Sequence, residues 1–263
     1  MIWLLARPDS EAAAQALTTV LNHGRGAGLA IGALGATDQP TEGDTVIVLG
    51  GDGTLIQAAR RFGCLGVRLL AINLGRLGYV TGFTAEQATE ALDALVAGEL
   101  TEEARLRLSV MHGGEDLGPA LNEALITSGT PGRSCTMTLR VDDRPATTLR
   151  GDGVLVATPT GSTAYALSAG GPILMPGMQA LVIVPVAPHS IRFRPLVVSP
   201  SRRLTVTADE SAWVVLDGQK RFQLRPGEPV EIHGNAPPVH LLKPKNYDHL
   251  ATLRSKLHWG EWT

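Results

Sequence analysis

Short aliphatic runs alternate with amphipathic stretches over the first part of the chain, up to about residue 100. Runs of this kind, bounded by polar residues or glycine, are typical of buried strands. The predicted strands are Ile2–Leu5, Leu29–Leu34, Thr45–Leu49 and Leu69–Ile72. Strands that alternate with helices in this way predict a parallel sheet with helices packed on it.

Three stretches between and after these strands predict helices. The first, Glu11–His23, has an N-cap at Ser10 and a glycine stop at Gly24. The last runs to Ala97 after a capping-box pattern at Thr84–Gln87. The middle helix has its apolar face on Leu55, Ile56, Ala59 and Phe62.

The pattern changes to an alternation of polar and apolar residues after about residue 100. Three segments show it, namely Arg105–Val110, Thr136–Val141 and Arg203–Thr207. Asp142–Pro145 and Asp217–Gln219 have the composition of hairpin turns. This part of the chain is therefore predicted to be mainly β.

The tail returns to helical spacing. Leu250, Leu253 and Leu257 predict a terminal helix, with Trp259 and Trp262 beyond it. We therefore expect an N-terminal α/β domain (1–100), Rossmann-like with a parallel sheet and helices, and a mainly β C-terminal domain (101–242). The tail (243–263) is expected to return its C-terminal helix to the N-terminal domain.

Composition excludes several classes of protein. The 263 residues carry a net charge of −2, with lysine and arginine scattered, so nothing indicates a nucleic-acid partner. No apolar run approaches the roughly 18 residues of a membrane helix, and Met1–Leu5 is too short for a signal peptide. Cys64 and Cys135 and the seven histidines show no metal-ligand spacing. We expect a soluble, cytoplasmic protein without a protein-bound metal.

A glycine-rich turn follows the strand Thr45–Leu49 directly. Its sequence at Gly50–Thr54 is G-G-D-G-T, and a helix follows. This context favours phosphate binding, because backbone N–H groups and the positive end of the helix point at the ligand. Asp52 is unexpected in an anion site. It either caps the helix, or it accepts the proton of a hydroxyl that lies beside the phosphates.

A second unusual stretch is Gly151–Ile173. It begins with a predicted strand at Val154–Thr158, continues irregularly from Pro159 to Leu167, and is rich in glycine and hydroxyl residues. Small residues let a backbone approach a ligand, hydroxyls can bind it, and the ring of Tyr165 offers a stacking surface.

The two stretches together resemble the NAD kinase family. The G-G-D-G-T motif is similar to one shared by NAD kinases, lipid kinases and 6-phosphofructokinases, whereas Gly151–Ile173 resembles the NAD kinase signature almost throughout. Asn122-Glu123 and the N-x-G-x-L-G element at Asn73–Gly78 agree in order and spacing. The resemblance covers the chain from about residue 45 to 220.

The resemblance implies a role for each site residue. Gly50, Gly51, Asp52, Gly53 and Thr54 would bind the nucleotide phosphates, with Asp52 as the catalytic base on the 2′-hydroxyl of the adenosine ribose. Residues that would bind NAD are Asn122, Glu123, Arg133, Arg150, Asp152, Thr160, Thr163, Ala164, Tyr165, Ala166, Leu167, Ser168 and Gln219. In some members Arg150 and Asp152 would reach the dinucleotide from a neighbouring subunit.

The family also implies substrates and assembly. The reaction would transfer a phosphoryl group from ATP, or from polyphosphate, to NAD and give NADP. Magnesium would accompany the ATP, and the protein would form a homodimer or homotetramer with the NAD site between its domains. Arg150, near the nicotinamide, favours NAD over NADH.

Other interpretations remain open from the residues alone. A lipid or sphingoid kinase would share the glycine-rich turn, and a non-catalytic sensor could keep the dinucleotide pocket. Ser168 lies in a sequence like a hydrolase nucleophile elbow, but no strand leads directly into it. Asp217 is interpreted as a turn residue, His189 as structural, and Arg202-Arg203 as a solvated face.

Overall fold

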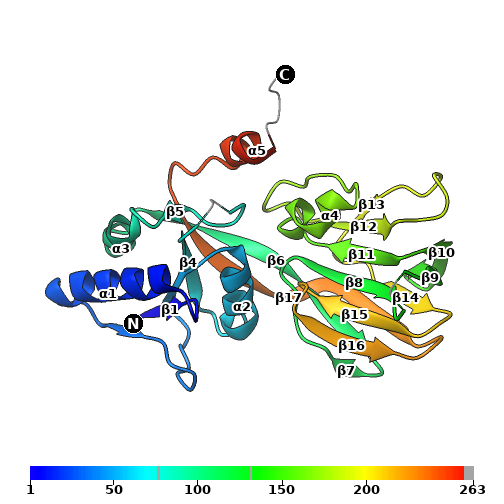
Figure 1. Ribbon diagram of the computed structural model, residues 1–263, viewed down its shortest axis with the longest axis horizontal. Coiled ribbons are helices and arrows are strands. Elements are labelled where there is room, and N and C mark those ends of the chain that lie inside the picture. Colours follow the sequence, from blue (N-terminus) through cyan, green and yellow to red (C-terminus); the bar gives the residue numbers. More distant parts are fainter. Residues whose placement is uncertain (76–77, 131, 258–263) are drawn as a thin grey trace. The chain divides into compact units, whose positions relative to one another are not determined.

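The computed structural model describes residues 1–75, 78–130 and 132–257, and the chain divides into two compact units (Figure 1). Unit 1 comprises Met1–Ala104 and the segment from Val239 onward. Unit 2 comprises Arg105–Pro238. The chain therefore leaves unit 1 once and returns to it.

A parallel sheet forms the centre of unit 1. Its strands are β1 (Ile2–Ala6), β2 (Ile31–Ala33), β3 (Thr45–Leu49), β4 (Arg68–Asn73), β5 (Phe83–Thr84) and the end of β17 (Pro229–Pro244). The strands are hydrogen-bonded in the order β2-β1-β3-β4-β17, with β5 also beside β4, and every pair is parallel. All residues of β3 are buried, as expected for a central strand of a parallel sheet.

Helices cover this sheet. They are α1 (Glu11–Gly26), α2 (Asp52–Phe62) and α3 (Ala88–Val96), whereas a further helix of unit 1, α5 (His249–Leu257), lies in its C-terminal segment. Val20 of α1 and Leu92 of α3 share one apolar cluster with the sheet, and α2 lies across the sheet from α1 (Figure 1). In α5, Leu253 is buried and Leu250 is exposed. Trp259 and Trp262, which follow the predicted terminal helix in the sequence, lie outside the described part of the chain.

The first helix extends beyond its predicted end at Gly24. Gly24 is buried inside α1, and a Cβ atom there would lie 3.0 Å from Cδ1 of Ile31 and 3.2 Å from Cδ2 of Leu92. The glycine therefore allows α1 to pack closely and does not stop it. The chain leaves the helix at Ala27 and turns at Gly28, whose φ is +72°.

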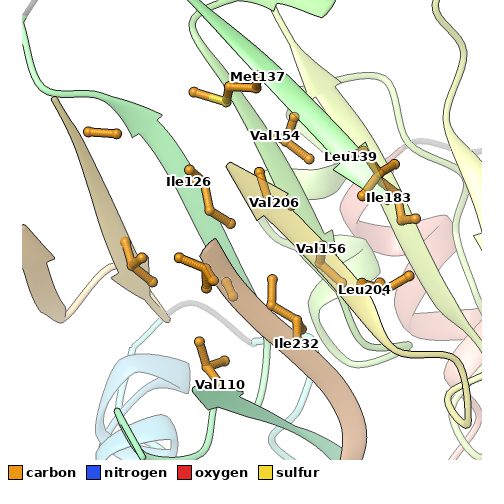
Figure 2. Packing of buried hydrophobic residues seen from close by; sticks show 14 of the residues in the cluster. Val110, Ile126, Met137, Leu139, Val154, Val156, Ile183, Leu204, Val206 and Ile232 are labelled. Atoms are coloured by element: carbon orange, nitrogen blue, oxygen red, sulfur yellow. The ribbon is translucent and has the colours of Figure 1, made fainter. Parts of the chain in front are cut away.

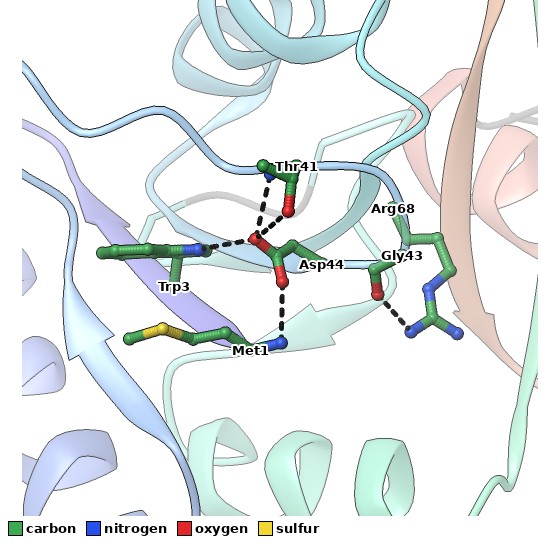
Figure 3. A network of polar contacts seen from close by, with 6 residues as sticks. All are labelled: Met1, Trp3, Thr41, Gly43, Asp44 and Arg68. Carbon is green, nitrogen blue, oxygen red and sulfur yellow. Dashed lines mark hydrogen bonds and ion pairs between the residues drawn. The ribbon is translucent and has the colours of Figure 1, made fainter.

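Asp44 organises the start of the sheet. Its Oδ1 atom accepts a hydrogen bond from the amino group of Met1 at 2.7 Å, and its Oδ2 atom accepts one from Nε1 of Trp3 at 3.1 Å (Figure 3). The backbone N–H of Thr41 also donates to Oδ2, at 2.9 Å. These hydrogen bonds, led by that from the amino group, lower the pKa of Asp44 to about 2. The carboxylate thus joins the link before β3 to the first residues of β1.

Unit 2 is built from two antiparallel sheets. Its strands are β6 (Leu100–His112), β7 (Glu115–Asp116), β8 (Glu123–Ser128), β9 (Cys135–Val141), β10 (Arg144–Gly151), β11 (Gly153–Ala157), β12 (Leu181–Val186), β13 (Leu196–Val198), β14 (Leu204–Ala208), β15 (Ala212–Leu216), β16 (Lys220–Leu224) and the start of β17. One sheet has the order β13-β12-β11-β8-β15-β16, and the other contains β10-β9-β14-β17. A single apolar cluster lies between them (Figure 2).

Figure 2 shows how both sheets contribute to this core: Ile126, Val154 and Val156 come from the first sheet, and Leu139 and Val206 come from the second. Alternate residues of each strand point inward, which explains the alternating sequence pattern. The predicted fold, an α/β N-terminal part, a mainly β part and a C-terminal helix that belongs to the first, is confirmed.

Candidate active site

The glycine-rich turn lies at the carboxyl end of β3. Helix α2 begins at Asp52, earlier than predicted, so Asp52 to Thr54 form its first turn after the N-cap Gly51. Gly50 packs tightly, because a Cβ atom there would lie 2.4 Å from Oγ1 of Thr54. In parallel sheets, ligands bind beyond the carboxyl ends of the strands, and this is where the turn lies.

A cavity of about 310 Å³ opens beside the start of α2. Its lining residues are Arg7, Pro8, Gly51, Gly53, Thr54 and Gln57. Arg7 follows β1, and its backbone N–H donates to the carbonyl of Leu49 at 3.0 Å, so the ends of β1 and β3 meet here. The positive end of α2 and the guanidinium of Arg7 make this cavity suitable for an anion.

Asp52 does not cap its own helix. Its Oδ2 atom accepts the backbone N–H of Tyr79 at 2.9 Å, and its Oδ1 atom accepts that of Val80 at 3.4 Å. The helix N-cap has no side-chain hydrogen bond, so the capping interpretation is wrong. Burial and then the negative charge of Asp52 raise the pKa of the Tyr79 phenol. The carboxylate is thus oriented by a segment that follows β4.

The N-x-G-x-L-G element supplies that segment. Asn73 at the end of β4 accepts the N–H of Gly75 at 3.0 Å through Oδ1, and its Nδ2 donates to Oγ1 of Thr81 at 3.3 Å. Gly78 also donates to Oγ1 of Thr81, at 3.2 Å. Residues 76 and 77 of the element lie outside the described part of the chain.

Asn122 and Glu123 lie at one end of the six-stranded sheet, where β8 begins. Their side-chain atoms Asn122 Oδ1 and Glu123 Oε2 are buried and have no hydrogen-bond partner. Buried polar atoms are nearly always hydrogen-bonded in native proteins. These two acceptors in one dipeptide therefore indicate a ligand that donates hydrogen bonds.

Asp217 holds the dipeptide Asn122-Glu123 in place. The sequence predicts only a turn residue at this position, so this role is additional. Asp217 lies in the β15–β16 turn with φ +51°, as predicted, but its carboxylate is buried and turned inward. Oδ1 accepts the backbone N–H groups of Asn122 at 2.7 Å and Glu123 at 3.2 Å, and Oδ2 accepts that of Leu121 at 3.0 Å. The composition of a turn predicts the backbone conformation at Asp217, but it does not predict that the carboxylate binds three backbone amides elsewhere in the chain.

The charge of Asp217 affects Glu123. Burial, followed by repulsion from Asp217, raises the pKa of Glu123 from 4.5 to about 7. The negative charge of Asp217 thus adds to burial in disfavouring the charged form of Glu123. Glu123 can therefore exchange a proton near neutral pH. Residues with a pKa shifted in this way are common at functional sites.

The hydroxyl-rich stretch packs against the same dipeptide. The hydroxyl of Thr158 donates to the carbonyl of Leu121 at 2.5 Å and accepts the N–H of Gly161 at 3.2 Å. A Cβ atom at Gly161 would lie 2.1 Å from the carbonyl oxygen of Asn122, so only glycine allows this approach. Asn122, Glu123 and the start of the hydroxyl-rich stretch are thus brought together.

The stretch itself is more regular than predicted. Gly161–Thr163 form a 3-10 helix and Tyr165–Ser168 form the short helix α4, so the predicted irregular segment is wrong. Ser162, which is buried, bonds the carbonyl of Pro159 and the N–H of Leu174, and this local bonding explains the turn. Ser168 ends α4 and does not lie at a strand-to-helix turn, which excludes a nucleophile elbow.

The predicted NAD-binding residues of this stretch differ in exposure. Tyr165 is 43% exposed and could stack on a planar group. Ala166 is fully buried in an apolar cluster with Leu155 and Val184, so only its backbone can meet a ligand. Of the remaining predicted residues, Thr160 is buried and Ser168 is exposed. Three are half-buried, namely Thr163, Ala164 and Leu167.

The other predicted NAD-binding residues fall into two places. Gln219 follows Asp217 in the same turn, and its N–H donates to Leu216 at 2.9 Å. Arg150 and Asp152 lie where β10 meets β11, at the opposite end of β8 and β11 from Asn122. Nε of Arg150 donates to Oγ of Ser134 at 3.2 Å. Arg133, the residue before Ser134, is exposed. One end of the sheet thus gathers Asn122, Glu123 and Gln219, and the other end gathers the arginines.

The described residues contain neither a cluster of metal ligands nor a membrane-spanning helix. Within residues 1–75, 78–130 and 132–257, no group of three or more His, Cys, Asp and Glu could hold a metal ion. Over the same residues, no helix has the length and apolar character to cross a membrane.

Comparison with known proteins identifies the family. The profile of the ATP-NAD kinase N-terminal domain matches residues 34–100, and that of the ATP-NAD kinase C-terminal domain matches residues 121–243. The chain belongs to the ATP-NAD kinase family. The resemblance found in the sequence is thereby confirmed, and with it the predicted enzyme class, an NAD kinase, over a lipid kinase.

Relatives of known name support this membership. The chain is 42% identical over 230 residues to an NAD kinase from Thiobacillus denitrificans, covering 85% of this chain and 79% of the relative. It is 39% identical over 231 residues to one from Geotalea daltonii, with 85% and 81% covered.

Two solved structures share the fold. An NAD kinase from Archaeoglobus fulgidus in complex with ATP matches with a TM-score of 0.82 and 28% identity, covering 98% of this chain and 99% of that one. A yeast NADH kinase complexed with NADH matches with a TM-score of 0.88, over 100% of this chain and 88% of that one. The yeast protein is only 20% identical, so its likeness concerns the fold.

Proposed function

We propose that this NAD kinase transfers the terminal phosphoryl group of ATP to the 2′-hydroxyl of the adenosine ribose of NAD, with Asp52 as the base. The observation that carries the proposal is the orientation of the Asp52 carboxylate at the first turn of α2, where its own helix does not use it. Each carboxylate oxygen has a second lone pair that can accept a hydroxyl proton.

The turn Gly50–Thr54 and the cavity beside it are the proposed phosphate site. The N-terminal end of α2 and Arg7 would stabilise the negative charge of the phosphates. Magnesium bound with ATP would neutralise that charge further. In a loose transition state the hydroxyl proton leaves late, so a correctly positioned carboxylate suffices as the base.

The buried acceptors of Asn122 and Glu123 are the proposed adenosine site. Asn122 Oδ1 and Glu123 Oε2 would accept hydrogen bonds from the amino group or hydroxyls of the adenosine. Thr160, Thr163, Ala164, Leu167 and Ser168 would line the dinucleotide pocket, with the ring of Tyr165 stacking and the backbone of Ala166 bonding. Gln219 would contribute from the turn beside Asp217.

Arg150 and Asp152 are proposed to act on a neighbouring subunit's dinucleotide, and Arg133 is proposed as a further contact to the dinucleotide. The assignment of Arg150 and Asp152 is supported by their place at the end of β8 and β11 that lies away from Asn122. It requires a homodimer or homotetramer, which light scattering of the purified protein would test, and we expect the enzyme to work in the cytoplasm.

A coupled assay tests the proposal. Purified protein is incubated with NAD, ATP and magnesium, and NADP is detected with an NADP-specific dehydrogenase. The variants are Asp52→Asn and, as a matched control, Asp116→Asn at an exposed position of β7. We expect NADP from the wild type and the control, and a loss of at least about a hundredfold in kcat for Asp52→Asn.

The outcomes separate the alternatives. Near-wild-type turnover by Asp52→Asn would refute the base. Turnover only with polyphosphate would show that ATP is not the phosphoryl donor and would leave NAD as the acceptor. Tight NAD binding without turnover by either donor would indicate a sensor. Comparing kcat/KM for NAD and NADH tests the expected preference for NAD.

A further inference from the structure

The backbone segment Gly78–Val80 holds Asp52 closely. Besides the two amide hydrogen bonds to the carboxylate, Gly78 lies so near that a Cβ atom there would be 2.0 Å from Oδ1 of Asp52. The position of the carboxylate therefore follows the position of this backbone segment, and whatever fixes the segment also fixes Asp52.

The same two residues, Tyr79 and Val80, are also hydrogen-bonded by the C-terminal part of unit 1. The hydroxyl of Tyr247 donates to the carbonyl of Tyr79 at 3.1 Å. The ammonium group of Lys243 donates to the carbonyl of Val80. Tyr79 and Val80 thus each donate to Asp52 through N–H and accept from the C-terminal part through C=O.

Lys243 and Tyr247 are themselves fixed. Lys243 follows the residues of β17 that pair with β4, and it is 1% exposed. Its Nζ atom lies 4.3 Å from the centre of the Tyr247 ring, and the N–H of Tyr247 donates to the carbonyl of Pro244 at 3.0 Å. Oγ1 of Thr252 on α5 donates to the Tyr247 hydroxyl at 3.4 Å. The donors therefore lie on a well-packed frame.

We propose that Lys243 and Tyr247 are positioning residues for Asp52 and that they act through the backbone of Tyr79 and Val80. The inference rests on the proposed role of Asp52 as the base. Small errors in the position of a catalytic group reduce the rate strongly, and supporting hydrogen bonds of this kind prevent them.

The burial of Lys243 supports a specific role. An ammonium group is expensive to bury, and a well-packed apolar side chain of similar volume is often at least as stabilising. Stability alone therefore does not explain a lysine at this position. Donation to a chosen carbonyl oxygen, which methionine cannot provide, does explain it.

Steady-state kinetics of Tyr247→Phe and Lys243→Met test the inference. The matched control is Lys245→Met, two residues farther on, where the side chain is exposed. We expect kcat to fall about five- to tenfold for Tyr247→Phe and at least about tenfold for Lys243→Met, with the KM values for NAD and ATP within about twofold of wild type. An unchanged kcat in both variants would overturn the inference.

Double variants separate positioning from a general structural effect. In an Asp52→Asn background, Tyr247→Phe should cause no further loss of kcat, because its effect passes through Asp52. A full additional loss in that background would refute the positioning role. Amide hydrogen exchange should accelerate at Tyr79 and Val80 in Tyr247→Phe, and unchanged exchange there would also count against it.

The two proposals can fail separately. If Asp52→Asn keeps wild-type turnover, the proposed base is wrong whatever the other variants do. If Asp52→Asn is inactive and the variants at 243 and 247 keep full kcat, only the positioning role is wrong.

Discussion

The carboxylate of Asp217 accepts the backbone N–H of Asn122 at 2.7 Å, across 95 residues of sequence. With the bonds to Leu121 and Glu123, one buried side chain aligns three successive amides at the start of β8. The unpartnered acceptors of Asn122 and Glu123 are thereby held in a fixed direction. If NAD binds here as proposed, its affinity should depend on Asp217 as well as on Asn122 and Glu123.

Replacing Asp217 by asparagine should weaken both the fold and the binding of NAD. The new NH₂ group would meet a backbone N–H, and a buried unsatisfied donor costs about 1–3 kcal/mol in the free energy of unfolding. Chemical denaturation and the KM for NAD measure the two effects. Asp143→Asn, in the exposed β9–β10 turn with φ +65°, is the control and should change stability by less than about 1 kcal/mol. Equal effects of the two variants would contradict the assigned role.

Replacing Glu123 by glutamine should stabilise the protein at high pH. The folded-state pKa of Glu123, about 7, lies above its ordinary value of 4.5, so the folded protein holds the proton more tightly than the unfolded chain. This contribution is fully present below pH 4.5 and is lost as the pH rises through about 7. The variant should therefore gain about 2–3 kcal/mol over wild type at pH 8 and little at pH 4.5. Melting temperatures at several pH values measure the difference, and a pH-independent difference would contradict the assignment.

Binding of NAD should release protons near pH 7. If adenosine donates hydrogen bonds to Glu123, it favours the ionised carboxylate, so affinity should rise with pH up to about 7 and then level off. Calorimetry of NAD binding in buffers of different ionisation enthalpy measures the proton release. The release should be absent in Glu123→Gln. Proton uptake would show instead that Glu123 binds in its protonated form.

Replacing Gly161 by alanine should raise the KM for NAD strongly. The new Cβ atom would lie 2.1 Å from the carbonyl oxygen of Asn122, which is backbone, so the dipeptide or the 3-10 turn must shift. We expect at least about a tenfold rise in KM. Gly26→Ala is the control, because a Cβ atom there meets nothing within 4 Å, and alanine in a helix should leave stability unchanged or raise it by less than about 1 kcal/mol. An unaltered KM would show that the close approach is not needed.

Local patterns predicted most of the fold. Thr45–Leu49 is a strand with the predicted bounds, because a buried parallel strand is a continuous aliphatic run between polar and glycine boundaries. The hairpin turn at Asp142-Asp143 was predicted because residues with φ > 0 have a strong composition signal. Gly24 shows where such rules fail. Glycine stops many helices, but here tertiary packing against Ile31 and Leu92 decides its role.

The candidate site was predicted only in part, for the same reason. Motifs give the identity of Asp52, Asn122 and Glu123, but not the bonds that orient them. Asp217 bonds Asn122 across 95 residues of sequence, and Lys243 and Tyr247 bond Val80 and Tyr79 across 163 and 168 residues, and no local pattern encodes such distances. The assigned roles of the NAD-binding residues stay predictions until variants are measured.

The chain re-enters unit 1 along strand β17, and this late return has a consequence during protein synthesis. The first 104 residues emerge from the ribosome long before His240–Leu242, which complete the edge of their sheet beside β4. Lys243 and Tyr247, which donate to the carbonyls of Val80 and Tyr79, are translated at the same late stage. A nascent chain can therefore form the glycine-rich turn Gly50–Thr54 early and still lack the hydrogen bonds from Lys243 and Tyr247 until translation is almost finished.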